Sequence, residues 1–291
     1  MADHVGLSIP HVTYVAFAGR DHVAAEVGLS AFSLLRVCKH PPRIHVLTDD
    51  SSMGSQLEKI GLSSDQATVQ LLARASVLEQ FAAYGFTRMA HHSGLGGYTK
   101  LLIPDLLPAS VRQTIVLDSD TLIVNDVGAL WTALRQTSAS KVDAVLAAKR
   151  LSTGGACLRG QRINSGVVLM NLNRMRELNW TSTMLHRLAK LSQKNVPARL
   201  CGKLVRNGSL AAGDQELLSY GCLSSDRGVC MPLPHGVHQD KCDGMSGGGQ
   251  AVVLHFVRRW FEHDVLKSPL SLHVKHRLLA LPSLLLLPTR I

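Results

Sequence analysis

The sequence predicts an α/β fold in which a mostly parallel central sheet is flanked by helices. Residues 114–117 are continuously apolar, as expected of a parallel strand that is covered on both faces. Residues 11–19, 21–39 and 43–49 have the patterns of a strand, a helix and a strand, which together form a βαβ unit with a right-handed crossover. Acidic residues directly follow the apolar strand, and ligands of such sheets bind beyond the carboxyl ends of the strands.

The elements follow in order from local patterns. Strand 11–19 runs into a glycine turn, and helix 21–39 carries apolar residues at helical spacing. A glycine-rich turn at 94–97 precedes a helix at 98–104, which should stop near Pro104 because proline disrupts a helix interior. The remaining predicted elements are strands around 68–72, 144–148, 163–171 and 251–256, helices at 175–191 and 214–220, and a mobile loop at 244–249.

Length and composition favour one large domain. The 291 residues are 46% apolar, which is enough for one extensive core. We expect an N-terminal extension at 1–10, the main domain at 11–265 and a C-terminal segment at 266–291. The extension has no long apolar core, and the leucine-rich stretch at 278–287 is short and broken by Pro282, so no membrane span is expected in this chain.

The charge balance points to an anionic partner. The formal net charge is +10, with 14 histidines besides, yet lysine and arginine are scattered and aromatic residues make up only 4% of the chain. Without a basic arm or an aromatic ladder, nucleic acid is not expected as a partner. A phosphate-bearing small molecule fits the charge equally well.

Two carboxylates, Asp118 and Asp120, stand one residue apart where the apolar strand ends. On a strand their side chains would project the same way, with Cα atoms ~6.6 Å apart. That spacing suits a hard cation that bridges a diphosphate, although a solvated turn is the commoner reason for such a pair. The position at a predicted ligand edge favours the metal site.

The six cysteines do not fix the cellular compartment. They lack the paired spacing of a zinc site, and they are too few for a disulfide-built scaffold. Cys230 and Cys242 flank a loop and could be bridged in an oxidising lumen, while two free thiols explain them equally well.

The order of these segments resembles the retaining glycosyltransferases of family 8 (GT8), which have the GT-A fold. The resemblance covers about residues 12–260 and includes the Asp-x-Asp motif. Within the family the likeness is strongest to the xylosyltransferase domains of the LARGE enzymes. The blocks that carry the family resemblance are 14–18, 98–100, 117–120, 164–167, 213–216 and 254–256, and those that carry the LARGE likeness are 91–94, 129–131, 233–235 and 240–242.

The resemblance implies a metal site and a catalytic pair. Asp118, Asp120 and His255 match the family's metal ligands, and two carboxylates with an imidazole suit Mn²⁺. A core histidine would be the default interpretation of His255 alone. Asp214 and Gln215 match a pair near the reacting anomeric carbon, although Asp214 could instead be the N-cap of the helix that follows.

The resemblance also implies residues that bind the nucleotide sugar. Lys100 matches a donor contact, with a solvated helix lysine as the alternative, and Asn164 and Ser165 match the donor-sugar pocket, with an ordinary turn as the alternative. Asp49 is a possible partner of the base or ribose, and a plain turn role explains it as well. The other implied donor contacts are Ala16, Phe17, Ala18, Ser119 and Arg258. Many relatives carry, at this point of the sequence, a glycine and then a lysine that binds the diphosphate, and this chain has neither of these two residues. Arg258 or Arg259 could supply the positive charge instead.

The implied function is transfer of a sugar, with xylose as the preferred guess, from a UDP-sugar to a hydroxyl of a glycan or glycoprotein acceptor. A UDP-glucose or UDP-galactose transferase, or a catalytically silent nucleotide-sugar-binding relative, remains the alternative. The family resemblance implies the Golgi lumen, and without a leader the location would be cytoplasmic.

Overall fold

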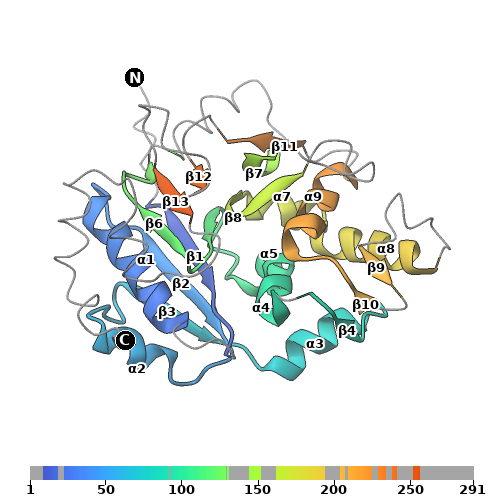
Figure 1. Cartoon of the computed structure of the whole chain (residues 1–291), viewed down its shortest axis with the longest axis horizontal. Helices are drawn as coiled ribbons and strands as arrows, with labels where there is room; N and C mark the ends of the chain where they lie inside the picture. The colour runs from blue at the N-terminus through green and yellow to red at the C-terminus, as the bar shows by residue number, and fades with distance from the viewer. Residues whose placement is uncertain are drawn as a thin grey trace, which may run out of the picture.

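A computed structural model of the chain describes residues 9–18, 23–91, 93–128, 130, 144–151, 162–193, 204–206, 209–224, 229–233, 238–240 and 252–255. They form an α/β fold in which helices pack on both faces of a central sheet (Figure 1). The predicted loop at 244–249, the C-terminal segment at 266–291 and Arg258 lie outside the described residues.

The central sheet contains seven strands within the described part of the chain, in the order β11-β7-β8-β5-β1-β2-β3. All neighbouring pairs are parallel except those of β8, which runs antiparallel to both β5 and β7. The beginning of β8 therefore lies at the edge where the parallel strands end. The strands are β1 (His11–Val15), β2 (Arg43–Thr48), β3 (Ala67–Leu71), β5 (Thr114–Leu117), β7 (Ala144–Arg150), β8 (Ile163–Met170) and β11 (Val229–Pro232).

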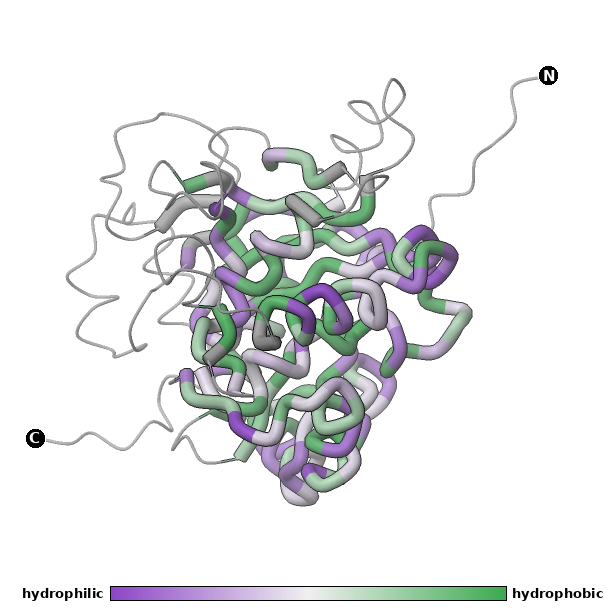
Figure 2. Tube along the Cα trace, turned by 90° about the vertical axis from the view of Figure 1, so that its right-hand side faces the viewer, coloured by the Kyte–Doolittle hydropathy of each residue, from purple (hydrophilic) through white to green (hydrophobic). Residues whose placement is uncertain are grey.

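Strand β5 shows why the centre of the sheet reads as a continuous apolar run. All four of its residues are buried. Ile115 and Leu117 pack in a core that includes residues of α1 (Val23–Val37), whereas Val116 packs in a second core with residues of α8 (Trp180–Gln193). Side chains alternate along a strand, so both faces must be apolar where helices cover both. The hydrophobic segments accordingly gather at the centre in Figure 2.

The helices lie in two groups on opposite faces of the sheet. Helix α1 buries Val27, Ala31 and Leu34, one helical turn apart, against the sheet. No helix of the described residues is long and apolar enough to cross a membrane. The other helices are α2 (Met53–Lys59), α3 (Arg74–Ala82), α4 (Gly94–Thr99), α5 (Ile103–Leu106), α7 (Leu172–Glu177) and α9 (Asp214–Ser224), with a 3₁₀ turn at Lys100–Leu102.

The predicted βαβ unit is confirmed by β1, α1 and β2, but three helix boundaries were wrong. Helix α4 begins at Gly94, at the predicted turn, and Gly94 has a φ of +62°. Pro104 lies in the first turn of α5, where its missing N–H group needs no partner. The helix predicted at 175–191 is divided, because Asn179 has a φ of +47° between α7 and α8.

One cysteine prediction also needs correction. Cys230 of β11 forms a disulfide with Cys222 of α9, with the two Cα atoms 5.3 Å apart. The proposed partner, Cys242, lies outside the described residues. The bridge ties the end of α9 to the edge strand β11, two elements that sequence spacing alone did not bring together.

Two small sheets complete the described structure. In one, β6 (Thr121–Ile123) pairs with β13 (Val253–His255), which also pairs with β12 (His238–Asp240). The antiparallel register of β13 and β6 places His255 opposite Thr121, directly after the two predicted metal carboxylates. The other sheet contains β4 (Arg88–Met89), β9 (Val205–Arg206) and β10 (Ser209–Leu210).

Candidate metal centre and its surroundings

The two carboxylates lie in a turn rather than on a strand. Strand β5 ends at Leu117, and Asp118 and Asp120 belong to the turn that leads into β6. The Thr121 hydroxyl closes this turn by donating a hydrogen bond of 2.7 Å to the Asp118 carbonyl. The predicted strand geometry was therefore wrong, although the turn still brings the two carboxylates close to each other.

A buried chain of hydroxyl groups holds this turn against the core. The Ser30 hydroxyl of α1 lies 2.8 Å from the Tyr14 hydroxyl and 2.9 Å from the Thr121 hydroxyl. All three side chains are fully buried. Because buried polar groups are costly unless they are hydrogen-bonded, this chain fixes α1, β1 and the turn relative to one another.

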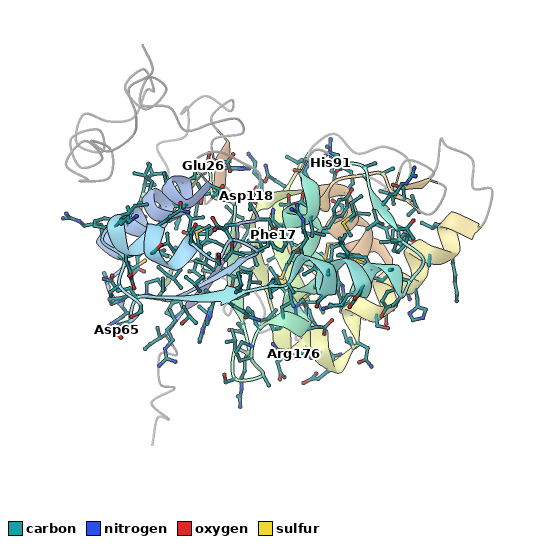
Figure 3. The ribbon with its side chains drawn as sticks, turned by 90° about the horizontal axis from the view of Figure 1, so that it is seen from below. Phe17, Glu26, Asp65, His91, Asp118 and Arg176 are labelled. Carbon is teal, nitrogen blue, oxygen red and sulfur yellow. A yellow bond between two sulfur atoms is a disulfide. The ribbon has the colours of Figure 1, made fainter. Side chains whose placement is uncertain are left out.

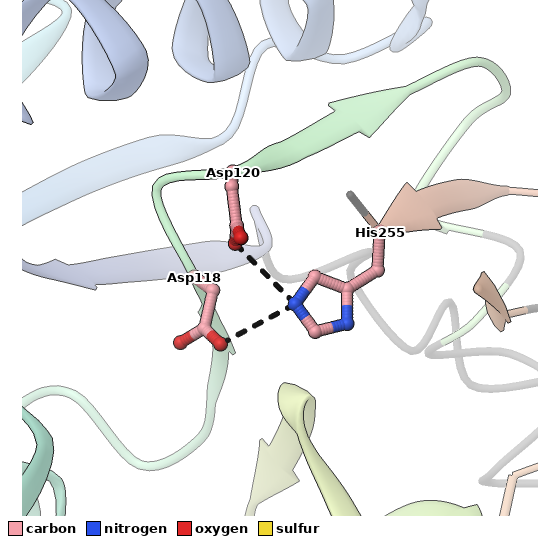
Figure 4. Close-up of side chains that lie close together, drawn as sticks. All are labelled: Asp118, Asp120 and His255. Atoms are coloured by element: carbon pink, nitrogen blue, oxygen red, sulfur yellow. Dashed lines mark ion pairs between the residues drawn. The ribbon is translucent and has the colours of Figure 1, made fainter. Parts of the chain in front are cut away.

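His255 completes the group of candidate ligands (Figure 4). Its Nε2 atom lies 3.3 Å from Asp120 Oδ1 and 3.5 Å from Asp118 Oδ2. One ligand atom from each of the three residues lies within 4.8 Å of the others. Two carboxylate oxygens and an imidazole nitrogen form a donor set that suits Mn²⁺ and similar divalent cations.

Gly166 of β8 makes room for the imidazole. A Cβ atom on Gly166 would stand 2.5 Å from Nδ1 and 2.6 Å from Nε2 of His255, which is well inside van der Waals contact. Only glycine therefore allows the ring to sit against β8 and face the carboxylates.

Lys100 connects the carboxylates to α9. Its ammonium group lies 2.5 Å from Asp118 Oδ1 and 2.7 Å from Asp214 Oδ2, and it donates a longer bond of 3.3 Å to the Ser165 carbonyl. The Lys100 side chain is only 6% exposed, and that of Asp214 is 10% exposed. Lys100 is therefore a buried cation shared by two acids, not a solvated helix lysine.

The pKa values follow from this arrangement. Burial alone would lower the pKa of Lys100, but Asp118 and Asp214 raise it above its usual range. Burial alone would raise the pKa of Asp118, but Lys100 and His255 bring it well below its usual range. The ammonium and the Asp118 carboxylate thus stay ionised at neutral pH.

The first residues of strand β8 lie near Lys100. Asn164 and Ser165 are buried, and the Asn164 side-chain oxygen accepts a hydrogen bond of 2.8 Å from the Gly166 N–H group. Both residues lie within the strand, so the alternative of an ordinary turn was wrong. Because β8 is reversed, its opening residues lie beside the end of β5.

The end of β1 supplies the backbone predicted to bind a nucleoside. Ala16 and Phe17 are buried, and the Ala18 N–H group donates to Asp49 Oδ1. Asp49 therefore fixes the loop after β1, and its other oxygen lies 3.6 Å from Arg74. Figure 3 shows Phe17 close to Asp118 in projection.

Ser119, between the two candidate metal ligands, is bound to α1. Its hydroxyl donates a hydrogen bond of 2.7 Å to Glu26 Oε2 in the first turn of α1. The sequence did not indicate Glu26, because helices often carry an acidic residue in the first turn for a purely local reason.

Asp214 and Gln215, the predicted catalytic pair, lie in the first turn of α9. The helix begins at Asp214 itself, whose carboxylate is bound to Lys100. The Gln215 side chain turns to Arg162, which also pairs with Glu216 at 2.5 Å. Arg162 was missed, since a lone arginine before a predicted strand carries no signal in the sequence.

Comparison with known sequences identifies the family. A family model described as glycosyl transferase family 8 matches residues 14–199. The human xylosyl- and glucuronyltransferase LARGE2 is 31% identical over 98 residues, which cover 31% of this chain and 14% of LARGE2. Mouse LARGE2 is 27% identical over 156 residues, which cover 51% of this chain and 22% of that protein. The matches thus span less than a quarter of these relatives.

Solved structures share the fold. An apo structure of mouse xyloside xylosyltransferase 1 aligns with a TM-score of 0.58 and 14% identity, over 86% of this chain and 97% of that chain. The galactosyltransferase LgtC, with donor and acceptor sugar analogues, aligns with a TM-score of 0.60 and 16% identity, over 92% and 94%. Both likenesses show the GT-A fold. The family match over most of the chain establishes that this protein belongs to glycosyltransferase family 8.

Proposed function

We propose that the protein is a metal-dependent, retaining glycosyltransferase that moves a sugar from a UDP-sugar to an acceptor hydroxyl. The observation that carries this proposal is the convergence of Asp118, Asp120 and His255 beside the Lys100 and Asp214 pair. Sequence segments more than a hundred residues apart meet there at the carboxyl edge of the parallel strands, where ligands of such sheets bind.

The donor set supports a divalent cation, with Mn²⁺ as the expected ion. Asp118, Asp120 and His255 would hold it, and when bound it would offset the charge of the diphosphate as this group leaves. Lys100 is suited to a phosphate oxygen as a point charge, although in this structure it is held by two carboxylates.

The chain's own side chains fit same-face displacement. The Asp214 carboxylate lies in the first turn of α9 and pairs with Lys100, and we assign it the role of steadying positive charge on the sugar. Asn164 and Ser165 would bind sugar hydroxyls, and Ala16, Phe17 and Ala18 would hold the nucleoside. The departing phosphate would help to take the proton from the acceptor hydroxyl.

The names of the relatives support xylose as the transferred sugar. The LARGE2 matches are xylosyl- and glucuronyltransferases, and one structural relative is a xyloside xylosyltransferase. A glycan or glycoprotein acceptor and a Golgi location belong to the same proposal.

The first experiment is an assay of UDP release. The purified protein is incubated with Mn²⁺ and a glycan acceptor panel, together with UDP-xylose, UDP-glucose, UDP-galactose or UDP-glucuronate. We expect release from UDP-xylose that EDTA abolishes, and a loss of at least about a hundredfold in Asp120→Asn. Release from another donor would keep the enzyme class and correct the sugar.

Asp65→Asn is the matched control, because Asp65 is exposed and lies far from Asp118 in Figure 3. It should retain wild-type rates. Wild-type speed in Asp120→Asn with the ion still bound would overturn the metal proposal. UDP binding without release from any donor would favour a catalytically silent relative.

A further inference from the structure

Arg162 contacts two consecutive residues of α9, Gln215 and Glu216. It directly precedes β8, and its Nη2 group lies 2.5 Å from Glu216 Oε1. The same guanidinium faces the Gln215 carboxamide. One side chain therefore connects the strand that carries Asn164 and Ser165 to the first turn of the helix that carries Asp214.

The chemistry of the contact fixes the orientation of the carboxamide. A guanidinium has only N–H donors, so the Gln215 oxygen must face it, and this oxygen then accepts from Nη2 at 3.0 Å and Nε at 3.2 Å. The opposite orientation would place the amide NH₂ against donors. Both lone pairs of the oxygen are occupied, so, as far as the described residues show, the NH₂ group is the part of Gln215 that can bind a ligand.

The strength of the ion pair suggests a geometric role. The Arg162 and Glu216 side chains are 32% and 27% exposed, and ion pairs at partly solvated sites contribute little to stability because water screens them. A hydrogen bond between a charged and a neutral group, as in the Gln215 contact, typically contributes more. We therefore expect the contact of Arg162 with the Gln215 amide to matter more than its ion pair with Glu216.

A second pair of hydrogen bonds holds the same turn. The Ser219 hydroxyl accepts from the Ile163 N–H group at 3.0 Å and donates to the Gln215 carbonyl at 2.5 Å. The backbone of Gln215 is thus attached to the start of β8 independently of Arg162. Loss of the guanidinium should free the Gln215 side chain while α9 stays in place.

We propose that Arg162 is a positioning residue. It orients the Gln215 side chain so that the amide NH₂ group donates a hydrogen bond to the nucleotide-sugar substrate. The amide NH₂ would bind a neutral oxygen of the transferred sugar, such as a hydroxyl group. An amide held in this way cannot offer its oxygen to a cationic sugar, so that role falls to Asp214 alone. The assignment of the ligand rests on the proposed function, whereas the orientation of the amide does not.

The first test needs no substrate. In NMR spectra of ¹⁵N-labelled protein, the side-chain NH₂ signals of Gln215 are assigned by their loss in Gln215→Ala. In Arg162→Met we expect them to move to the position typical of a freely rotating glutamine, whereas Glu216→Gln should leave them largely unchanged. Unchanged signals in Arg162→Met, or an equal effect of Glu216→Gln, would overturn the proposal.

The second test measures binding of UDP and of UDP-xylose in the presence of Mn²⁺. Arg162→Met should weaken UDP-xylose roughly tenfold and leave UDP within about twofold. The double variant with Gln215→Ala should bind UDP-xylose as Gln215→Ala alone does. Additive losses would show that Arg162 acts independently of Gln215 and would refute the positioning role.

Two controls separate the possible failures. Arg174→Met removes an ion pair of α7 with Glu177, at 3.0 Å, and should change neither affinity. Arg162→Lys keeps a charge beside Glu216 but cannot occupy both lone pairs of the amide oxygen, so it should not restore UDP-xylose binding. If wild-type protein bound neither probe, the proposed function would fail, while the NMR test would still decide the orientation of Gln215.

Discussion

Replacing Lys100 with methionine should destabilise the metal-free protein by about 3–5 kcal/mol, because it leaves Asp214 as an uncompensated buried charge. The Nζ atom lies 2.5 Å from Asp118 and 2.7 Å from Asp214. At an effective dielectric constant of about 20, unit charges at such a separation attract by about 6 kcal/mol. In the wild type, desolvation of the buried charges offsets several kcal/mol of this attraction. When one partner is removed, the attraction is lost but the desolvation cost of the remaining buried charge stays.

The effect should depend on pH in a defined direction. Lys100 and His255 bring the pKa of Asp118 below its unfolded value, so this stabilisation is complete above about pH 5 and is lost as the pH falls through the folded pKa. Without Lys100, the raising effect of burial on the pKa of Asp118 is opposed by His255 alone, so the variant loses less stability than the wild type as the pH falls. The two proteins should differ most above pH 5 and least in acid.

Urea unfolding in EDTA from pH 3.5 to pH 8 measures this difference. Lys59→Met, at the exposed end of α2, is the control and should match the wild type within about 0.5 kcal/mol. A difference in the free energy of unfolding below about 1 kcal/mol, or one that does not change with pH, would refute the argument from the buried ion pairs.

Three further predictions concern the close contact of Gly166 with His255, the hydrogen bonds of Arg176 and the titration of His45. Gly166→Ala should displace His255 and weaken Mn²⁺ binding in calorimetry by at least about tenfold. Arg176→Met removes hydrogen bonds to several carbonyls, including one of 2.9 Å to Val111, and should cost about 2–3 kcal/mol in urea unfolding. Burial lowers the pKa of His45 from 6.5 to about 4, so stability falls as the pH drops through that window, and His45→Gln should remove about 1–2 kcal/mol of this loss.

Each of these predictions has a matched control. Gly54→Ala adds a methyl group where nothing lies within 4 Å, so it should leave Mn²⁺ affinity unchanged. Arg174→Met and the exposed His186→Gln serve in the same way for stability and for its pH dependence. Wild-type Mn²⁺ affinity in Gly166→Ala, an unchanged midpoint in Arg176→Met, or an unchanged pH slope in His45→Gln would contradict the respective argument.

Local patterns in the sequence predicted the β1–α1–β2 unit and β5, because continuous burial leaves a clear apolar signature. The grouping of Asp118, Asp120 and His255 was also predicted, from family resemblance rather than from spacing. Helix boundaries were less predictable. Pro104 and Asn179 act through backbone conformation, which residue type alone leaves open.

Contacts between distant segments could not be predicted from local patterns. Lys100 precedes Asp118 by 18 residues and Asp214 by 114, and no local rule indicates that it bridges them. The same holds for Arg162 and for the disulfide of Cys222 with Cys230. These contacts depend on the reversed direction of β8 and on the placement of α9, which are properties of the whole fold.

The hydroxyl chain from Tyr14 through Ser30 and Thr121 to the Asp118 carbonyl has a thermodynamic consequence. Because the core holds the turn that carries Asp118 and Asp120, a cation would meet a preorganised site. It would not have to order the backbone of this turn. Such an ion would stabilise the fold through mass action, by about 2.7 kcal/mol at a hundred times its dissociation constant. It would do so without changing the surface exposed on unfolding, so the urea m-value would be the same with and without Mn²⁺.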